Sequence, residues 1–139
     1  MNQRLDVPLP IDLRILIVDD ISDNSFLLQT FLEAEGYQVD IADNGQTALE
    51  KIEAAPPALV LLDVMMPGMS GYEVTRHVRQ NPALPYIPIL LITGFDQTAD
   101  SKGFDVGVDG FIRKPVDFDQ LLAQVRSLLS QNSKAVTKQ

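Results

Sequence analysis

Acidic, hydroxyl and ammonium side chains stand directly after apolar runs in this sequence. The runs end in Asp19-Asp20, in Asp63, in Thr93 and in Lys114-Pro115. If the runs are parallel strands of one sheet, their carboxyl ends meet at one edge, where such sheets bind ligands. For any single aspartate, exposure at a strand end is the simpler interpretation, because exposed acids are common. The joint pattern instead indicates a shared site.

Three carboxylates at one site predict a bound cation. Like charges that converge repel one another, and the cost falls only when a proton or a cation joins them. One lysine cannot neutralise three acids, and oxygen ligands completed by water suit Mg²⁺. With a hydroxyl and an ammonium added, the set is typical of a phosphoryl-transfer site, in which an aspartate carboxylate can itself be the nucleophile.

The apolar runs alternate with segments of helical periodicity. The runs cover residues 14–18, 37–41, 58–62, 87–92 and 111–112. Three of them are apolar at consecutive positions, which is typical of parallel strands buried on both faces. Because strand and helix patterns alternate five times, the sequence predicts an α/β fold: a doubly wound, five-stranded parallel sheet with helices on both faces.

Capping residues predict where the helices begin and end. Ser70 and Glu73 have the spacing of a capping box. Asp43 and Asp117 are expected to cap two further helices in the same way. Gly36 stands where the first helix should stop.

The domain is expected to span residues 13–130, with 1–12 as an N-terminal extension and 131–139 as a polar C-terminal tail. One element inside it is poorly defined. The fourth helix, at 97–106, has few apolar residues and contains Gly103, so it is predicted to be short.

Composition excludes several classes of protein. The chain has 139 residues, a formal net charge of −8 and no cysteine. Disulfides and zinc–thiolate sites are therefore absent, and the acidity argues against direct binding to nucleic acid or anionic lipid. No apolar run approaches the roughly 18 residues of a membrane span. The first residues also lack the apolar stretch of a signal peptide, so a cytoplasmic location is expected.

Four blocks of the sequence resemble the receiver domain of two-component response regulators, the CheY-like superfamily. They lie at 15–20, 61–71, 92–94 and 110–115, and the likeness extends over about 14–129. The resemblance implies the flavodoxin-like (βα)5 fold with strand order 2-1-3-4-5. Few residues follow it, so a stand-alone receiver is favoured, with removal of an output domain as the open alternative.

The resemblance also implies a role for each site residue. Asp63 is the phosphoacceptor, which takes a phosphoryl group from the phosphohistidine of a sensor histidine kinase or a histidine phosphotransfer protein. Mg²⁺ or Mn²⁺ is held by Asp20, by Asp63 and by the backbone carbonyl of Met65, and by Asp19 through water. The domain is then a signalling phosphoacceptor, whose own chemistry is phosphotransfer and autodephosphorylation, and not a turnover enzyme.

The remaining family residues form a switch. Lys114 is expected to pair with the phosphoryl oxygens, and the Lys114-Pro115 bond to be cis. Thr93 turns its hydroxyl onto the phosphate and Phe111 moves into the vacated space. This changes the surface of the fourth helix, fifth strand and fifth helix, which a downstream protein or a second copy of the chain can bind. Gly94 departs from the family pattern of Ala or Ser after the switch threonine.

The residues also bear on three other classes of function. A receiver-like scaffold that is never phosphorylated remains the alternative, although such a scaffold would tolerate loss of Asp63, Asp20 or Lys114 and all three are present. A phosphohydrolase with an aspartate nucleophile needs a second acid two residues later, where this chain has Met65. A nucleotide-binding sheet is disfavoured because no glycine-rich phosphate loop occurs.

Overall fold

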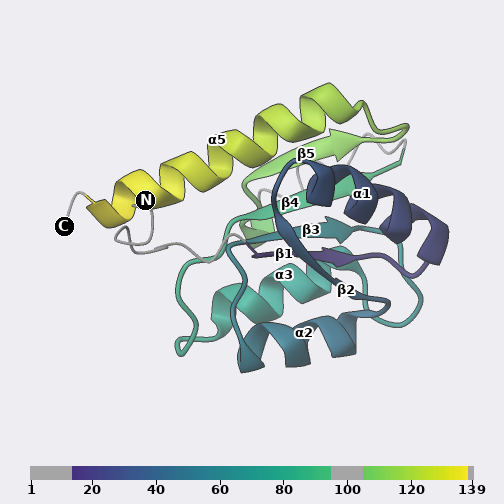
Figure 1. The fold of residues 1–139 in the computed structure, drawn as a ribbon. Coiled ribbons are helices and arrows are strands. Elements are labelled where there is room, and N and C mark those ends of the chain that lie inside the picture. Colours follow the sequence, from purple (N-terminus) through teal and green to yellow (C-terminus); the bar gives the residue numbers. More distant parts are fainter. Residues whose placement is uncertain (1–13, 95–104, 138–139) are drawn as a thin grey trace.

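A computed structural model describes residues 14–94 and 105–137, in which five parallel strands form one sheet between two helical layers (Figure 1). The strands are β1 (Arg14–Val18), β2 (Gln38–Ala42), β3 (Leu59–Asp63), β4 (Ile89–Thr93) and β5 (Gly110–Arg113). Their order in the sheet is β2-β1-β3-β4-β5, as predicted. The helices are α1 (Ser22–Ala34), α2 (Gly45–Ala54), α3 (Gly71–Gln80) and α5 (Phe118–Thr137).

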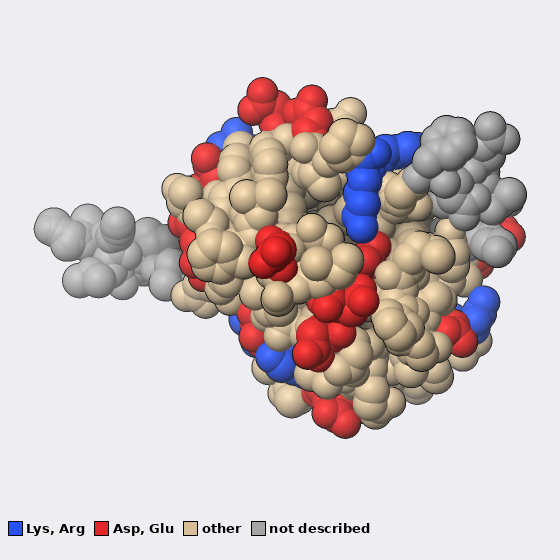
Figure 2. Space-filling view, turned by 90° about the vertical axis from the view of Figure 1, so that its right-hand side faces the viewer, with Lys and Arg blue, Asp and Glu red and all other residues tan. Residues whose placement is uncertain are grey.

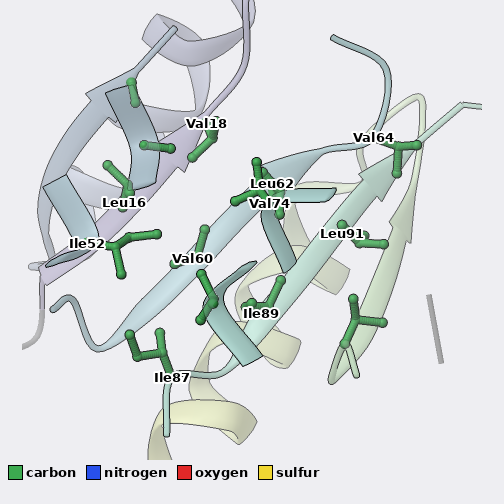
Figure 3. Packing of buried hydrophobic residues seen from close by; sticks show 14 of the residues in the cluster. Leu16, Val18, Ile52, Val60, Leu62, Val64, Val74, Ile87, Ile89 and Leu91 are labelled. Atoms are coloured by element: carbon green, nitrogen blue, oxygen red, sulfur yellow. The ribbon is translucent and has the colours of Figure 1, made fainter. Parts of the chain in front are cut away.

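Helices cover both faces of the sheet, which explains the consecutive apolar residues of the strands. In β3 every residue is buried, and alternate side chains belong to different cores. Val60 and Leu62 pack with α2 and α3, beside Ile89 and Leu91 of β4 (Figure 3). Leu59 and Leu61 contact the core that α1 and α5 complete on the other face.

Two of the three predicted helix caps are present as expected. Ser70 and Glu73 form a reciprocal capping box at the start of α3. The Asp117 carboxylate accepts a hydrogen bond from the amide of Gln120 at 3.1 Å. The prediction for α2 was wrong by one residue: Asn44 is the cap, and Asp43 is not. Since β2 extends to Ala42, one residue beyond its predicted end, the cap also falls one residue later.

The last helix is longer than the sequence pattern predicts. α5 continues to Thr137, so residues 131–137, assigned above to a polar tail, are helical. No proline or glycine occurs in 131–139, and extending an existing helix requires no new nucleation. The predicted N-terminal extension and most of the predicted fourth helix lie outside the described residues. Within the described ranges, no helix is both long and apolar enough to cross a membrane.

Candidate functional site

The three predicted acidic residues meet at the carboxyl ends of β1 and β3. These strands are neighbours, with Val18 paired to Leu62, so the residues that follow them lie at the same edge. Carboxylate oxygens of Asp19, Asp20 and Asp63 all lie within 4.8 Å of one another. Figure 2 looks onto this edge, where acidic side chains gather near the middle and a basic side chain lies beside them.

Asp19 and Asp20 differ in how they are held. Asp19 is 3% exposed, and its carboxylate accepts a hydrogen bond from the amide of Ile21 at 2.9 Å. Its own amide donates to the carbonyl of Ala42 at the end of β2. Asp20 is exposed to solvent. One carboxylate is therefore fixed by the backbone, whereas the other is accessible from solution.

Asp63 carries the most strongly perturbed charge of the cluster. It is the last residue of β3 and is only 3% exposed. Burial and the nearby Asp19 carboxylate raise the pKa of Asp63 above its ordinary value. The Lys114 ammonium, whose Nζ lies 3.3 Å from Asp63 Oδ1, and the amide of Met65 lower this pKa without cancelling the increase. The site thus holds more negative charge than its lysine offsets.

Lys114 and Thr93 are brought to the site by the two strands beyond β3. The amide of Lys114 donates to the carbonyl of Thr93 at 2.8 Å, which continues the pairing of β5 with β4. The peptide bond from Lys114 to Pro115 is cis. The buried hydroxyl of Thr93 donates to the carbonyl of Gly94 at 3.2 Å.

The start of α3 lies in close contact with the backbone of Asp63 and Val64. The amide of Gly71 donates to the carbonyl of Val64 at 2.9 Å. A Cβ on Gly71 would lie 2.5 Å from the carbonyl oxygen of Asp63, so only glycine fits. Gly71 is the last residue of the motif block 61–71, and the motif alone did not predict this close approach. Its position at the first residue of a capped helix, soon after a strand, was the available signal. At Gly94, by contrast, a Cβ would meet no atom of the described residues within 4 Å.

The other two residues singled out by the resemblance lie close to this edge. Met65 follows Asp63 by two residues, and its side chain is 74% exposed. Phe111 is partly buried and packs against the core on the α2 and α3 face. Its carbonyl accepts a hydrogen bond from Gln124 of α5 at 3.0 Å. Phe111 therefore links the strand that precedes Lys114 to the last helix.

The donor set fits a divalent cation. Three carboxylates within 4.8 Å supply hard oxygen ligands. Burial and the Asp19 carboxylate raise the pKa of Asp63, so a nearby cation would stabilise its charged form. Mg²⁺, a small ion that prefers oxygen ligands, would accept these carboxylates and supply the positive charge. The described part of the cluster offers no sulfur or imidazole ligand for a softer metal.

A cavity of about 290 Å³ adjoins the acidic cluster. It lies between α1 and the segment from Lys114 to Phe118, and Asp19 and Lys114 form part of its wall. Apolar side chains line the rest, among them Leu27 and Phe118. On α1, Phe26 and Leu27 are 67% and 55% exposed. The site thus opens beside an apolar surface.

Similar proteins carry the same domain. Response regulator PleD of Caulobacter vibrioides is 46% identical over 116 residues, which is 83% of this chain and 26% of PleD. Response regulator ArlR of Staphylococcus saprophyticus is 40% identical over 84% of this chain and 52% of its own length. The chain therefore spans about a quarter of the length of PleD and about half of the length of ArlR.

Solved structures share the fold over almost their whole length. A response regulator of Chloroflexus aurantiacus superposes with a TM-score of 0.82 at 33% identity, covering 86% of this chain and 99% of that one. The chemotaxis protein CheY4 of Vibrio cholerae gives a TM-score of 0.78 at 28% identity, and the match covers 85% of this chain and 99% of that one. The family model of the response regulator receiver domain matches residues 15–126, and with the sheet order and acidic cluster described above, the chain belongs to this receiver-domain family.

Proposed function

We propose that this receiver domain accepts a phosphoryl group on Asp63 from the phosphohistidine of a sensor histidine kinase or a histidine phosphotransfer protein. The observation that carries the proposal is the setting of Asp63. Its carboxylate lies at the end of the central strand, within 4.8 Å of two other carboxylates and 3.3 Å from the Lys114 ammonium. The transfer makes the protein a signalling phosphoacceptor, whose only chemistry is this phosphotransfer and its own dephosphorylation.

In the transfer step an oxygen of the Asp63 carboxylate attacks the phosphorus atom. The new O–P bond forms as the N–P bond of the phosphohistidine breaks, and the electron pair of that bond returns to the imidazole nitrogen, which takes up a proton. The product is an acyl phosphate on Asp63. Lys114, already beside Asp63, donates to a phosphoryl oxygen and so stabilises the negative charge that arrives with the group.

Asp20, Asp63 and the backbone carbonyl of Met65 would hold Mg²⁺ or Mn²⁺ directly, with Asp19 acting through water. The bound ion supplies positive charge to the phosphoryl oxygens during transfer. Asp19 keeps its orientation through the hydrogen bond from Ile21, and the burial of Asp63 keeps bulk water from its carboxylate.

The phosphoryl group then acts on Thr93 and Phe111. Rotation of the Thr93 side chain would take its hydroxyl from the carbonyl of Gly94 to a phosphoryl oxygen. Phe111 would move inward into the space that Thr93 vacates. The result is a change in the surface of the fourth helix, β5 and α5, where a downstream protein or a second copy of the chain binds.

The phosphodonor is proposed to bind at α1. Phe26, Leu27 and the cavity beside Lys114 give an apolar surface next to Asp63, which suits a helical protein that presents its phosphohistidine there. Direct contact with nucleic acid or a membrane is not part of the proposal, because the net charge of −8 repels polyanions. A cytoplasmic location is part of it, since kinases make the phosphohistidine from ATP inside the cell.

The test is the intact mass of the protein after incubation with Mg²⁺ and acetyl phosphate, a small phosphodonor. We expect a gain of one phosphoryl group that disappears in Asp63→Asn and in the presence of EDTA. Asp119→Asn, which changes an exposed aspartate in α5, is the matched control and should be labelled normally. Failure of the unsubstituted protein to gain mass, with acetyl phosphate and with a panel of histidine kinases, would favour the unphosphorylated scaffold.

A further inference from the structure

Arg79, near the end of α3, connects this helix to the segments that lead into β4 and β5. These segments lie at the amino-terminal ends of the strands, on the side of the sheet opposite Asp63. Its guanidinium donates to the carbonyl of Gly107 through Nε at 2.8 Å and to the carbonyl of Ile87 through Nη1 at 2.7 Å. Nη2 pairs with a carboxylate oxygen of Asp109 at 3.1 Å, and the two side chains are 18% and 20% exposed. These charge-assisted bonds are therefore largely shielded from solvent.

Asp109 and Tyr86 complete this cluster, here called the Arg79 clasp. Asp109 also accepts a hydrogen bond from the amide of Ile89, the first residue of β4, at 2.8 Å, and another from the Tyr86 hydroxyl. The Arg79 guanidinium lies 4.5 Å from the centre of the Tyr86 ring. Burial and the hydrogen bond to Asp109 raise the pKa of Tyr86 to about 12, so the phenol stays protonated and keeps donating.

The chain that leads into β5 passes directly against the guanidinium. Gly107 has φ of +97°, and a Cβ there would lie 3.3 Å from Arg79 Nε. Asp109, which immediately precedes β5, donates its amide to the carbonyl of Ile89 at 2.8 Å. The clasp therefore fixes the starts of β4 and β5 relative to each other.

β5 needs contacts that fix its position relative to β4, because its own sequence specifies its register only weakly. In the described sheet it is a four-residue strand at the edge, paired with β4 alone. Its two large apolar residues are adjacent: Ile112 is buried in one core and Phe111 packs against the other. A slip of one residue would exchange two apolar side chains between two apolar faces, which costs less than exposing one of them.

We infer that the Arg79 clasp sets the register of β5, and that Arg79 is thereby a positioning residue for Lys114. Lys114 follows β5 directly. A slip of one residue displaces a strand by about 3.3 Å. That displacement equals the whole separation of 3.3 Å between Lys114 Nζ and Asp63 Oδ1, so the ammonium would lose its partner. This inference rests on the role proposed above for Asp63 and Lys114.

The first test probes how firmly β5 is paired with β4, without phosphorylation. Arg79→Lys keeps the positive charge but loses the planar fork that grips several acceptors at once. Amide hydrogen exchange in β5 is expected to become about tenfold faster, while exchange in β1 and β3 stays unchanged. Arg76→Lys, an exposed change on the same helix, is the control. Unchanged exchange in β5 would overturn the inference, as would equal acceleration throughout the sheet.

The second test asks whether Arg79 acts through Lys114. Phosphorylation by acetyl phosphate with Mg²⁺ is followed by intact mass in the unsubstituted protein, in Arg79→Lys, in Lys114→Ala and in the double variant. Arg79→Lys alone is expected to slow the reaction about tenfold, but to add less than about twofold once Lys114 is absent. Equal slowing in both backgrounds would show a general structural defect and overturn the inference. If the unsubstituted protein took up no phosphoryl group, the proposed function would fail, and exchange in β5 would still decide the register.

Discussion

Replacing Asp63 by asparagine is expected to stabilise the metal-free protein. At a separation of up to 4.8 Å, the Asp19 and Asp63 carboxylates repel each other by about 3 kcal/mol at an effective dielectric constant of about 20. At the same dielectric constant the Lys114 ammonium, whose Nζ lies 3.3 Å from Asp63 Oδ1, would attract Asp63 by about 5 kcal/mol. Its side chain is 34% exposed, so solvent screens much of this attraction. Burial of the Asp63 carboxylate adds a further cost of ionisation and is the largest cause of its raised pKa. The raised pKa of Asp63 shows that the unfavourable contributions prevail. We expect a net gain of about 1 kcal/mol, which is about 4 °C in melting temperature for a chain of this length.

The pH dependence of this difference follows from linkage. Asp63 binds its proton more tightly in the folded protein than in the unfolded chain, so its ionisation destabilises the fold. The gain in the free energy of unfolding that Asp63→Asn provides is therefore complete at neutral pH. It shrinks as the pH falls through the raised pKa of Asp63, and it is gone below the ordinary value of 3.8.

Divalent metal should reverse the order of the two proteins. Mg²⁺ at about 100 times its dissociation constant stabilises the native protein by about 2.7 kcal/mol, whereas the variant lacks one carboxylate ligand. The assay is urea or thermal denaturation of both proteins in EDTA and in Mg²⁺, from pH 4 to pH 8. A variant less stable than the native protein in EDTA at neutral pH would refute the electrostatic reasoning. Asp119→Asn should show neither effect.

Four further variants probe the residues around Asp63. Gly71→Ala places a Cβ 2.5 Å from the Asp63 carbonyl oxygen and should weaken Mg²⁺ binding about tenfold or more. Gly94→Ala places a Cβ where no described residue lies within 4 Å and should leave the Mg²⁺ affinity unchanged. Isothermal titration compares the two variants, and equal affinities would contradict the argument. Ser70→Ala removes the cap of α3 and should cost about 1 kcal/mol in urea denaturation, and a loss near zero would mean that the capping box contributes nothing. Lys114→Ala should still be phosphorylated slowly, but phosphorylation should no longer change amide hydrogen exchange in β5 and α5. A full change in exchange would exclude Lys114 as the residue that connects the phosphoryl group to this surface.

Sequence reasoning predicted the sheet and the composition of the acidic cluster for physical reasons. Consecutive apolar residues such as those of β3 require burial on both faces, which only a parallel sheet between helices provides. Once β1 and β3 are neighbours, Asp19, Asp20 and Asp63 must share an edge, because parallel strands end together. These conclusions depend on periodicity, which a sequence displays directly, and on the strand order, which the resemblance to receiver domains implies and the structure shows.

Features that depend on particular contacts were beyond the sequence. Asp43 and Asn44 are both good capping residues, and only the end of β2 decides between them. The polar residues of 131–137 gave no sign that α5 continues through them. Arg79 drew no attention because its partners, Ile87, Gly107 and Asp109, become neighbours only when β4 and β5 pair.

The strand order separates the fixed groups of the site from the responsive ones. Asp63 ends β3, which has a strand on each side and a core on each face, so its carboxylate is held where the sheet is least deformable. Phe111 lies on β5, at the border of the described sheet, where one flank has no neighbouring strand. Exposed residues at this border can therefore vary without disturbing Asp63, as long as β5 keeps the register that places Lys114 beside it. Under the proposed function, new downstream targets can be acquired by altering exposed residues of β5 and α5, while the acidic cluster that would receive the phosphoryl group stays the same.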